Sequence, residues 1–114
     1  MHHKIIRLYD FIEQDKAFKE FKEESESLGS NKEELHNIVK IIMLIIQYEL
    51  TDRQMYCFCK YVIDGKKMKE ISQELKICIP TVSRHINMAK RKILKYLRYS
   101  KAVDKYVSSK TYDD

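Results

Sequence analysis

A chain of 114 residues with a formal net charge of +5 has the size of a single domain. Its two glycines and one proline leave little material for hairpin turns, which argues against most all-β architectures and favours helices. The longest apolar run, residues 41–46, is too short to cross a bilayer, and the polar start is not that of a secretion signal, so no membrane association is expected and the expected location is cytoplasmic.

The cysteines do not form a disulfide or metal-binding pattern. Cys57, Cys59 and Cys78 are odd in number, and the first two would point their thiols roughly 200° apart on a helix. Together with His36 and His85 they do not have the spacing of a four-ligand zinc site. We expect neither a metal ion nor another cofactor.

The charge is divided unevenly along the chain. Residues 1–50 contain 7 Lys/Arg and 10 Asp/Glu, whereas residues 51–114 contain 15 Lys/Arg and 7 Asp/Glu. No acidic residue occurs from Leu75 to Lys101. A basic half joined to an acidic half indicates that one part meets a polyanion and the other has a different role. The alternative is a surface charged only for solubility.

The first half of the chain predicts two helices. Apolar residues recur with helical spacing from residue 4 to about residue 24, and Glu23–Ser30, which contains Gly29, predicts a loop. Asn31 can cap a second helix that is apolar over more than half its girth. Its apolar residues are Leu35, Ile38, Val39, Ile41, Ile42, Met43, Leu44, Ile45 and Ile46. Such a helix is central to a core or to an oligomer interface.

A third helix is predicted to begin near Leu50, because Thr51 and Gln54 have the spacing of a capping box. It is predicted to end at Asp64-Gly65, where glycine suits a left-handed turn. The inner stripe of this helix consists of Met55, Phe58, Cys59 and Val62.

A fourth helix is predicted from about Met68 to Leu75, followed by a turn at residues 76–79. A fifth helix runs from Pro80, which suits a first helical residue, to about Tyr99. Residues 101–114 carry only a weak apolar stripe and either extend this helix or fray.

The fifth helix has two unlike faces when its residues are placed at 100° intervals. One side carries the apolar residues Val82, Ile86, Ala89, Ile93 and Leu97. The opposite side carries Arg84, Met88, Arg91 and Lys95. This division suits a recognition helix, which packs on its domain by one face and enters the major groove of DNA with the other.

The leading end of this helix suits base reading. Arg84 is the first candidate for a base contact, since a guanidinium can bind guanine O6 and N7 together. Basic residues further along the helix, namely Arg91, Lys92, Lys95 and Arg98, are expected at the phosphate backbone. The expected DNA-binding residues are Thr81, Ser83, Arg84, His85, Asn87, Met88, Arg91, Lys95, Lys66, Lys67 and Lys69. The alternative is a solvated helix end whose cations complement the helix dipole.

These segments resemble region 4 of bacterial sigma factors, and the helix-turn-helix of response-regulator output domains is a second match. The resemblance rests on Leu50–Gln54, Tyr61, Gly65, Lys69–Ile77, Thr81–Ile86 and Ala89-x-x-Lys92-Ile93, and covers about residues 50–97. It implies a four-helix arrangement whose last helix reads DNA through Thr81, Arg84 and His85. Lys76 stands where the family often has glycine, and a non-glycine residue with positive φ is disfavoured.

The first 49 residues are too short for sigma region 2 and contain no Trp, so the resemblance implies a stand-alone protein. The chain also resembles the small YlxM-type proteins, whose sigma-like domain accompanies a signal recognition particle system. We expect an all-α fold of about five helices. Residues 1–49 form an N-terminal helical pair for dimerisation or partner docking, residues 50–100 the helix-turn-helix, and residues 101–114 a tail.

The expected function is that of a sequence-specific, double-stranded DNA-binding transcriptional regulator. One such module buries little surface, so we expect a homodimer through residues 4–49, with recognition helices about 34 Å apart. Binding as a monomer alongside RNA polymerase is the competing arrangement. The alternative function is a protein-interaction module that docks on RNA polymerase or a ribonucleoprotein. The sequence contains no phosphate loop, zinc pair or nucleophile motif, so no enzyme is expected.

Overall fold

The computed structural model of the chain describes residues 2–26 and 32–110, and all regular secondary structure in this part is helical. The elements are α1 (His2–Gln14), α2 (Lys16–Glu26), α3 (Lys32–Glu49), α4 (Asp52–Phe58), the π-helical turn η1 (Cys59–Ile63), α5 (Met68–Leu75) and α6 (Ile79–Lys110). The expected all-α class is confirmed, with six α-helices over the described residues where about five were expected. None of these helices has the length and apolar character needed to cross a membrane.

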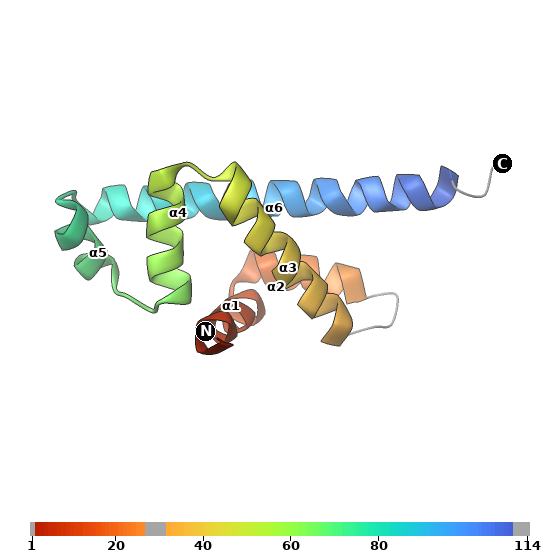
Figure 1. The fold of residues 1–114 in the computed structure, drawn as a ribbon, viewed down its shortest axis with the longest axis horizontal. Coiled ribbons are helices and arrows are strands. Elements are labelled where there is room, and N and C mark those ends of the chain that lie inside the picture. Colours follow the sequence, from red (N-terminus) through yellow and green to blue (C-terminus); the bar gives the residue numbers. More distant parts are fainter. Residues whose placement is uncertain (1, 27–31, 111–114) are drawn as a thin grey trace.

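Helix α6 runs along the whole molecule, which measures 57 × 25 × 24 Å (Figure 1). At one end α4 and α5 pack against its N-terminal turns, and α2 and α3 contact its middle (Figure 1). Helix α1 packs on α2, α3 and η1. At 32 residues, α6 is roughly 48 Å long at 1.5 Å per residue. Of the two alternatives left open beyond Tyr99, extension of the helix is confirmed, because residues 101–110 continue α6. Residues 111–114 of the expected tail lie outside the described residues.

The single helix predicted from residue 4 to about 24 is two helices that meet at Asp15. The Asp15 N–H donates to the Phe11 carbonyl at 2.8 Å, so backbone bonding continues through the junction. The Asp15 carboxylate also accepts the Phe18 N–H at 3.5 Å, in the manner of an N-cap for α2. The apolar stripe shifts in phase at this junction, because on one continuous helix Phe18 and Phe21 would lie roughly 130° from Leu8 and Ile12.

The predicted loop at Glu23–Ser30 begins later than expected. Helix α2 continues to Glu26, so the first part of that segment is helical. The remainder, with Gly29 and the expected cap Asn31, lies outside the described residues.

The first core unites the N-terminal helices with α6. Buried residues from α1, α2, α3, α4 and η1 surround the middle of α6. They are Leu8, Ile12, Phe18, Phe21, Ile38, Val39, Ile42, Ile45, Ile46, Phe58 and Val62, packed on Ala89, Ile93 and Leu97. Two edge-to-face ring contacts by Phe11, to Phe18 at 4.9 Å and to Phe58 at 5.6 Å, join α1, α2 and α4. The N-terminal helices therefore share one core with α4 and α6.

A second, smaller core holds the helix-turn-helix together. Cys57, Ile71, Val82 and Ile86 are fully buried and bring α4, α5 and the first turns of α6 into contact. Burial raises the pKa of the Cys57 thiol, an effect that the nearby Arg53 guanidinium partly offsets. The capping box predicted at the start of α4 is confirmed: Thr51 Oγ1 accepts the Gln54 N–H at 3.2 Å, and Gln54 Oε1 accepts the Thr51 N–H at 3.1 Å.

The turn between α5 and α6 is closed by a lysine in the left-handed conformation. Lys76 has φ 57° and ψ 45°, and among the described residues it is the only non-glycine with positive φ. The Ile77 N–H donates back to the Ser72 carbonyl at 3.1 Å, and the Ser72 hydroxyl donates to the Ile77 carbonyl at 2.7 Å. The turn thus keeps the geometry usual for glycine even though lysine occupies the position.

We expect Lys76→Gly to stabilise the protein by about 0.5–1 kcal/mol. Left-handed backbone costs a residue with a Cβ roughly 1–2 kcal/mol, and the larger entropy of glycine in the unfolded chain offsets part of the gain. Urea unfolding followed by circular dichroism measures this difference. Lys76→Ala is the matched control, since it removes the same charge and keeps the Cβ. Equal stability of the two variants would show that the backbone at this position carries no strain.

Candidate nucleic-acid interface

The exposed side of α6 carries the basic residues that the helical wheel placed there. Val82, Ala89 and Ile93 on the opposite side are fully buried. Five predicted contact residues are exposed, namely Arg84, Asn87, Met88, Arg91 and Lys95. Thr81, Ser83 and His85 are half-buried at the leading end of the helix. The structure therefore gathers these eight residues on α6, and the exposed ones spread over about three helical turns.

Two other lysines of α6 are engaged inside the molecule. Lys92 donates to the Glu49 carbonyl at 3.1 Å and to Gln54 Oε1 at 3.2 Å. It stabilises the end of α3 and the buried amide of the α4 capping box. The Lys92 ammonium thus has two partners within the chain, and its expected contact with the DNA backbone stays a prediction. Lys90 likewise pairs with Asp15 at 3.0 Å and lies over the Phe11 ring at 5.4 Å.

A physical rule separates the engaged lysines from the exposed cations. On the helical wheel, Lys90 and Lys92 lie about 60° and 100° from the centre of the buried stripe, on its two sides. Long side chains at such flanking positions can reach polar groups on the neighbouring helices. Arg84, Arg91 and Lys95 lie roughly 160–180° from that centre and are exposed. The angle from the apolar stripe was the sequence signal that could have distinguished the two groups.

The N-terminus of α6 is arranged around Cys78. The Cys78 carbonyl accepts the N–H groups of Thr81 at 3.0 Å and Val82 at 3.2 Å. The Cys78 thiol lies 3.6 Å from the Thr81 hydroxyl. Pro80 is the second residue of the helix, one position later than predicted, and its missing N–H leaves no bond unmade in the first turn.

The three lysines predicted before and within α5 lie apart from α6 in sequence and have different surroundings. Lys67 and Lys69 are exposed, and the Lys67 N–H donates to Glu70 Oε1 at 2.9 Å at the start of α5. Lys66 is half-buried and lies 3.8 Å from the Glu74 carboxylate. An ion pair of this length between side chains that remain accessible to solvent contributes little to the stability of the fold. The Lys66 ammonium can therefore exchange this partner for another anion.

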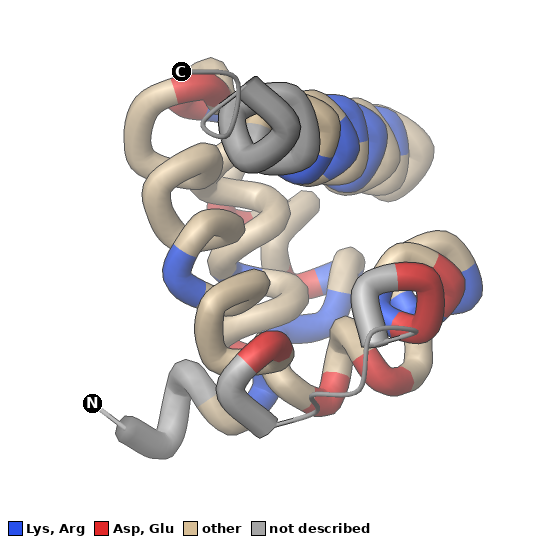
Figure 2. Tube along the Cα trace, turned by 90° about the vertical axis from the view of Figure 1, so that its right-hand side faces the viewer, with Lys and Arg blue, Asp and Glu red and all other residues tan. Residues whose placement is uncertain are grey.

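Charge is distributed so that α6 forms the basic side of the molecule. Figure 2 shows Lys and Arg recurring along the coloured part of α6, and the acidic residues that it colours lie on other elements. A shallow hollow of about 220 Å³ lies on this side, between Gln54 and the residues Met88, Arg91, Lys92 and Lys95. Among the described residues, no three His, Cys, Asp or Glu side chains come close enough together to bind a metal ion.

The helix-turn-helix is also recognisable by comparison with known proteins. Residues 48–95 match the family model GerE, described as bacterial regulatory proteins of the luxR family. This region, fewer than half of the residues, runs from the end of α3 to the middle of α6 and is similar to the helix-turn-helix domain of luxR-type regulators, which is related to the sigma region 4 type. Neither a curated protein nor a solved structure was found to match the chain.

Proposed function

We propose that the chain is a sequence-specific regulator of transcription that places the first five turns of α6 in the major groove of double-stranded DNA. One observation carries this proposal: Arg84, Arg91 and Lys95 are exposed on the side of α6 opposite the buried stripe. The luxR-type domain at residues 48–95 supports it, since helices of this motif read base edges near their N-terminus.

Within this proposal the residues have distinct roles. Arg84 reads a guanine with its guanidinium, while Thr81, His85 and Asn87 contact neighbouring bases. Ser83, Arg91 and Lys95 contact phosphates, Met88 packs against the groove wall, and Lys66, Lys67 and Lys69 bind the backbone beside the groove. Each phosphate contact lowers the slope of log K against log salt by about 0.9, so affinity falls steeply with salt.

Selection of bound sequences from a random pool of duplex DNA, at a stated salt concentration, tests this function. Recovery of a defined motif supports it. Enrichment of no sequence, with binding that depends only on salt, would leave a general polyanion binder and would contradict a specific regulator.

The proposed regulator acts as a homodimer. The apolar faces of α1 and α2 are buried within the chain, so they are not available for the expected pairing through residues 4–49. Helix α3, which belongs to that segment, keeps Met43, Leu44 and Tyr48 exposed. Of these, Leu44 and Tyr48 adjoin Tyr99 and Val103 of α6 around an apolar groove of about 400 Å³. Within the described part of the chain, four of the nine exposed large hydrophobic residues thus lie on one surface, a concentration typical of an interaction site.

A second copy is the occupant that we propose for this groove. The groove lies between α3 and the C-terminal half of α6, and the proposed DNA-reading end lies at the opposite end of the same helix (Figure 1). Pairing at this end leaves both recognition surfaces open, which a dimer that reads two half-sites requires. The Tyr96 hydroxyl at the groove wall hydrogen-bonds to the Glu49 carboxylate, which raises the pKa of Tyr96 and fixes its ring.

We expect Leu44→Glu to convert the dimer into a monomer, because a carboxylate would be buried in an apolar interface. Ile6→Glu is the matched control: Ile6 is 56% exposed and Leu44 55%, and only Leu44 lines the groove. Sedimentation equilibrium at tens of micromolar protein measures the mass of each form. A monomeric wild-type protein would contradict the dimer. Co-purification of RNA polymerase or a ribonucleoprotein through the same groove would then favour the alternative role of a docking module.

A further inference from the structure

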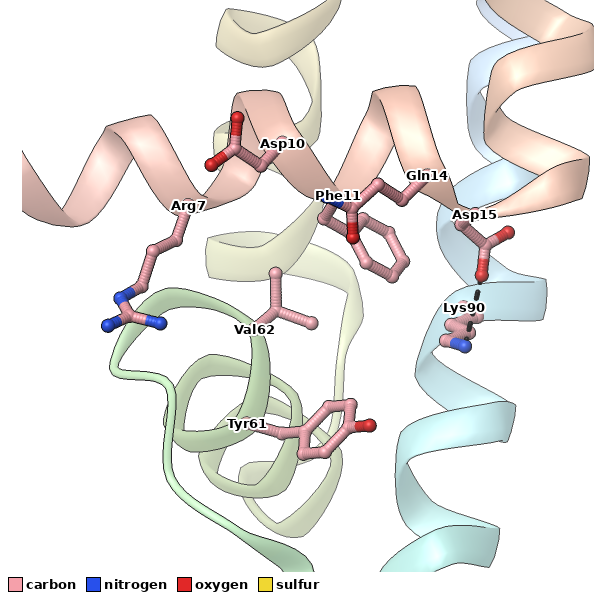
Figure 3. Close-up of a pocket in the computed structure, with 8 residues that line it drawn as sticks. All are labelled: Arg7, Asp10, Phe11, Gln14, Asp15, Tyr61, Val62 and Lys90. Carbon is pink, nitrogen blue, oxygen red and sulfur yellow. Dashed lines mark ion pairs between the residues drawn. The ribbon is translucent and has the colours of Figure 1, made fainter.

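A polar hollow of about 460 Å³ lies on a different side of the molecule, away from the exposed basic face of α6. It is enclosed by α1, the junction of α1 with α2, η1 and α6 (Figure 3). Its volume falls within the range of about 300–1,000 Å³ found for small-molecule sites. Segments from three distant parts of the sequence meet here, so the hollow exists only in the folded chain.

The floor of the hollow is apolar and fixed in place. Phe11 and Val62 lie at its centre, with the polar side chains around them (Figure 3). The Phe11 ring is held by its edge-to-face contacts with Phe18 and Phe58, and Val62 is buried. Val62 and Tyr61 reach the hollow from a π-helical turn, a form of helix that is rare and occurs frequently at functional sites.

The charges at one end of the hollow neutralise each other. Asp15 and Lys90 form an ion pair of 3.0 Å, with side chains only 18% and 27% exposed. Asp15 is further engaged as the cap of α2, and Lys90 by its position over the Phe11 ring. This pair closes the hollow toward α6 and leaves no net charge there.

The polar groups at the other end have no partner. Within the described part of the chain, Arg7, Asp10, Gln14 and Tyr61 make no hydrogen bond or ion pair through their side chains. Arg7 lies over Gly65, whose φ is 72°, and a Cβ at that position would collide with the Arg7 guanidinium. The absence of a side chain at Gly65 therefore gives the guanidinium its place at the rim. Arg7 and Asp10, three residues apart on α1, offer one positive and one negative charge above an apolar floor.

We propose that this hollow binds a small zwitterion of the amino-acid type with an apolar side chain. The ligand carboxylate is bound by Arg7, which can donate two parallel N–H bonds, and the ligand ammonium is bound by Asp10. The side chain of the ligand covers Phe11 and Val62, while Tyr61 and Gln14 supply the remaining hydrogen bonds. This inference stands independently of DNA binding, since none of these residues belongs to the proposed DNA-reading face.

Titration of the full-length protein with L-phenylalanine or L-leucine, followed by ¹H–¹⁵N correlation spectra, tests the proposal. We expect saturable shifts at the backbone amides of residues 7–15, 61–65 and 90. Two matched compounds test the contribution of each ligand charge to binding: 3-phenylpropanoate has no ammonium group, and 2-phenylethylamine has no carboxylate. Each should bind at least about tenfold more weakly than phenylalanine, because each lacks one charge-assisted hydrogen bond.

Two substitutions assign the groups. Arg7→Gln removes the group proposed to bind the carboxylate, so this variant should bind phenylalanine no better than 2-phenylethylamine. Asp10→Asn removes the negative charge proposed to bind the ammonium, so that variant should bind phenylalanine no better than 3-phenylpropanoate. Arg98→Gln, which changes an exposed arginine outside the hollow, should leave all affinities unchanged. The absence of saturable shifts with both amino acids would overturn the proposal. Equal affinities of phenylalanine and its two analogues for the wild-type protein would also overturn it, and this comparison needs no variant to fold.

Discussion

Arg84→Ala is expected to lower the affinity for the selected DNA sequence by about 1–3 kcal/mol, roughly 5- to 150-fold, without changing the stability of the fold. The side chain is exposed and directed away from both cores, so its loss removes no internal contact. Its proposed partner is a guanine edge, which no other group can satisfy once the guanidinium is gone. Fluorescence anisotropy with the selected duplex and with a scrambled duplex measures the two affinities.

Two variants separate base reading from charge. Arg84→Lys keeps the positive charge but loses the planar fork, so we expect the preference for the selected duplex to fall while the salt slope stays unchanged. Arg91→Ala should weaken binding to both duplexes equally. It should also reduce the magnitude of the slope of log K against log salt by about 0.9, the contribution of one phosphate contact. If Arg84→Ala and Arg91→Ala behaved alike on both duplexes, Arg84 would be a phosphate contact and the proposed base reading would be wrong.

Phe58→Ala is expected to destabilise the whole chain by about 3–5 kcal/mol, the range found when a large aromatic is removed from a core. Phe58 is fully buried, its ring contacts Phe11 of α1, and it ends α4 just before η1. A cavity at this position touches the N-terminal helices and the helix-turn-helix together. Urea unfolding followed by far-UV circular dichroism and by tyrosine fluorescence measures the change.

The same experiment tests whether residues 1–49 and residues 50–100 fold as one unit. We expect a single transition with coincident midpoints for both probes, because Ala89, Ile93 and Leu97 of α6 belong to the core of the N-terminal helices. Ile6→Ala, at a position 56% exposed, should change stability by no more than about 0.5 kcal/mol. Two separate transitions in the wild-type protein would show that the segments are independent domains.

The sequence predicted the helix-turn-helix well because its signals are local. The capping box at Thr51, the turn after Leu75 and the apolar stripe of α6 each depend on residues within a few turns of one another. The side of α6 on which Arg84, Arg91 and Lys95 lie followed from spacing alone.

Features that depend on contacts between residues far apart in the sequence could not be predicted from it. The junction at Asp15 is fixed in part by Lys90, which is 75 positions away, and the engagement of Lys92 depends on the end of α3. The alternation of apolar residues could not show that α1 and α2 bury their faces within the same chain rather than against a second copy. The polar hollow was equally invisible, because its lining is assembled from segments separated by many residues.

Helix α6 passes without interruption through both cores, so a tilt about a point near Ala89 would move both of its ends. The first turn lies ten residues from that point, roughly 15 Å along the axis, so a tilt of about 10° would displace it by about 2–3 Å. A shift of this size is comparable to the length of a hydrogen bond. An adjustment of the N-terminal helices that tilted α6 by this amount would therefore be large enough to make or break contacts at its N-terminal end.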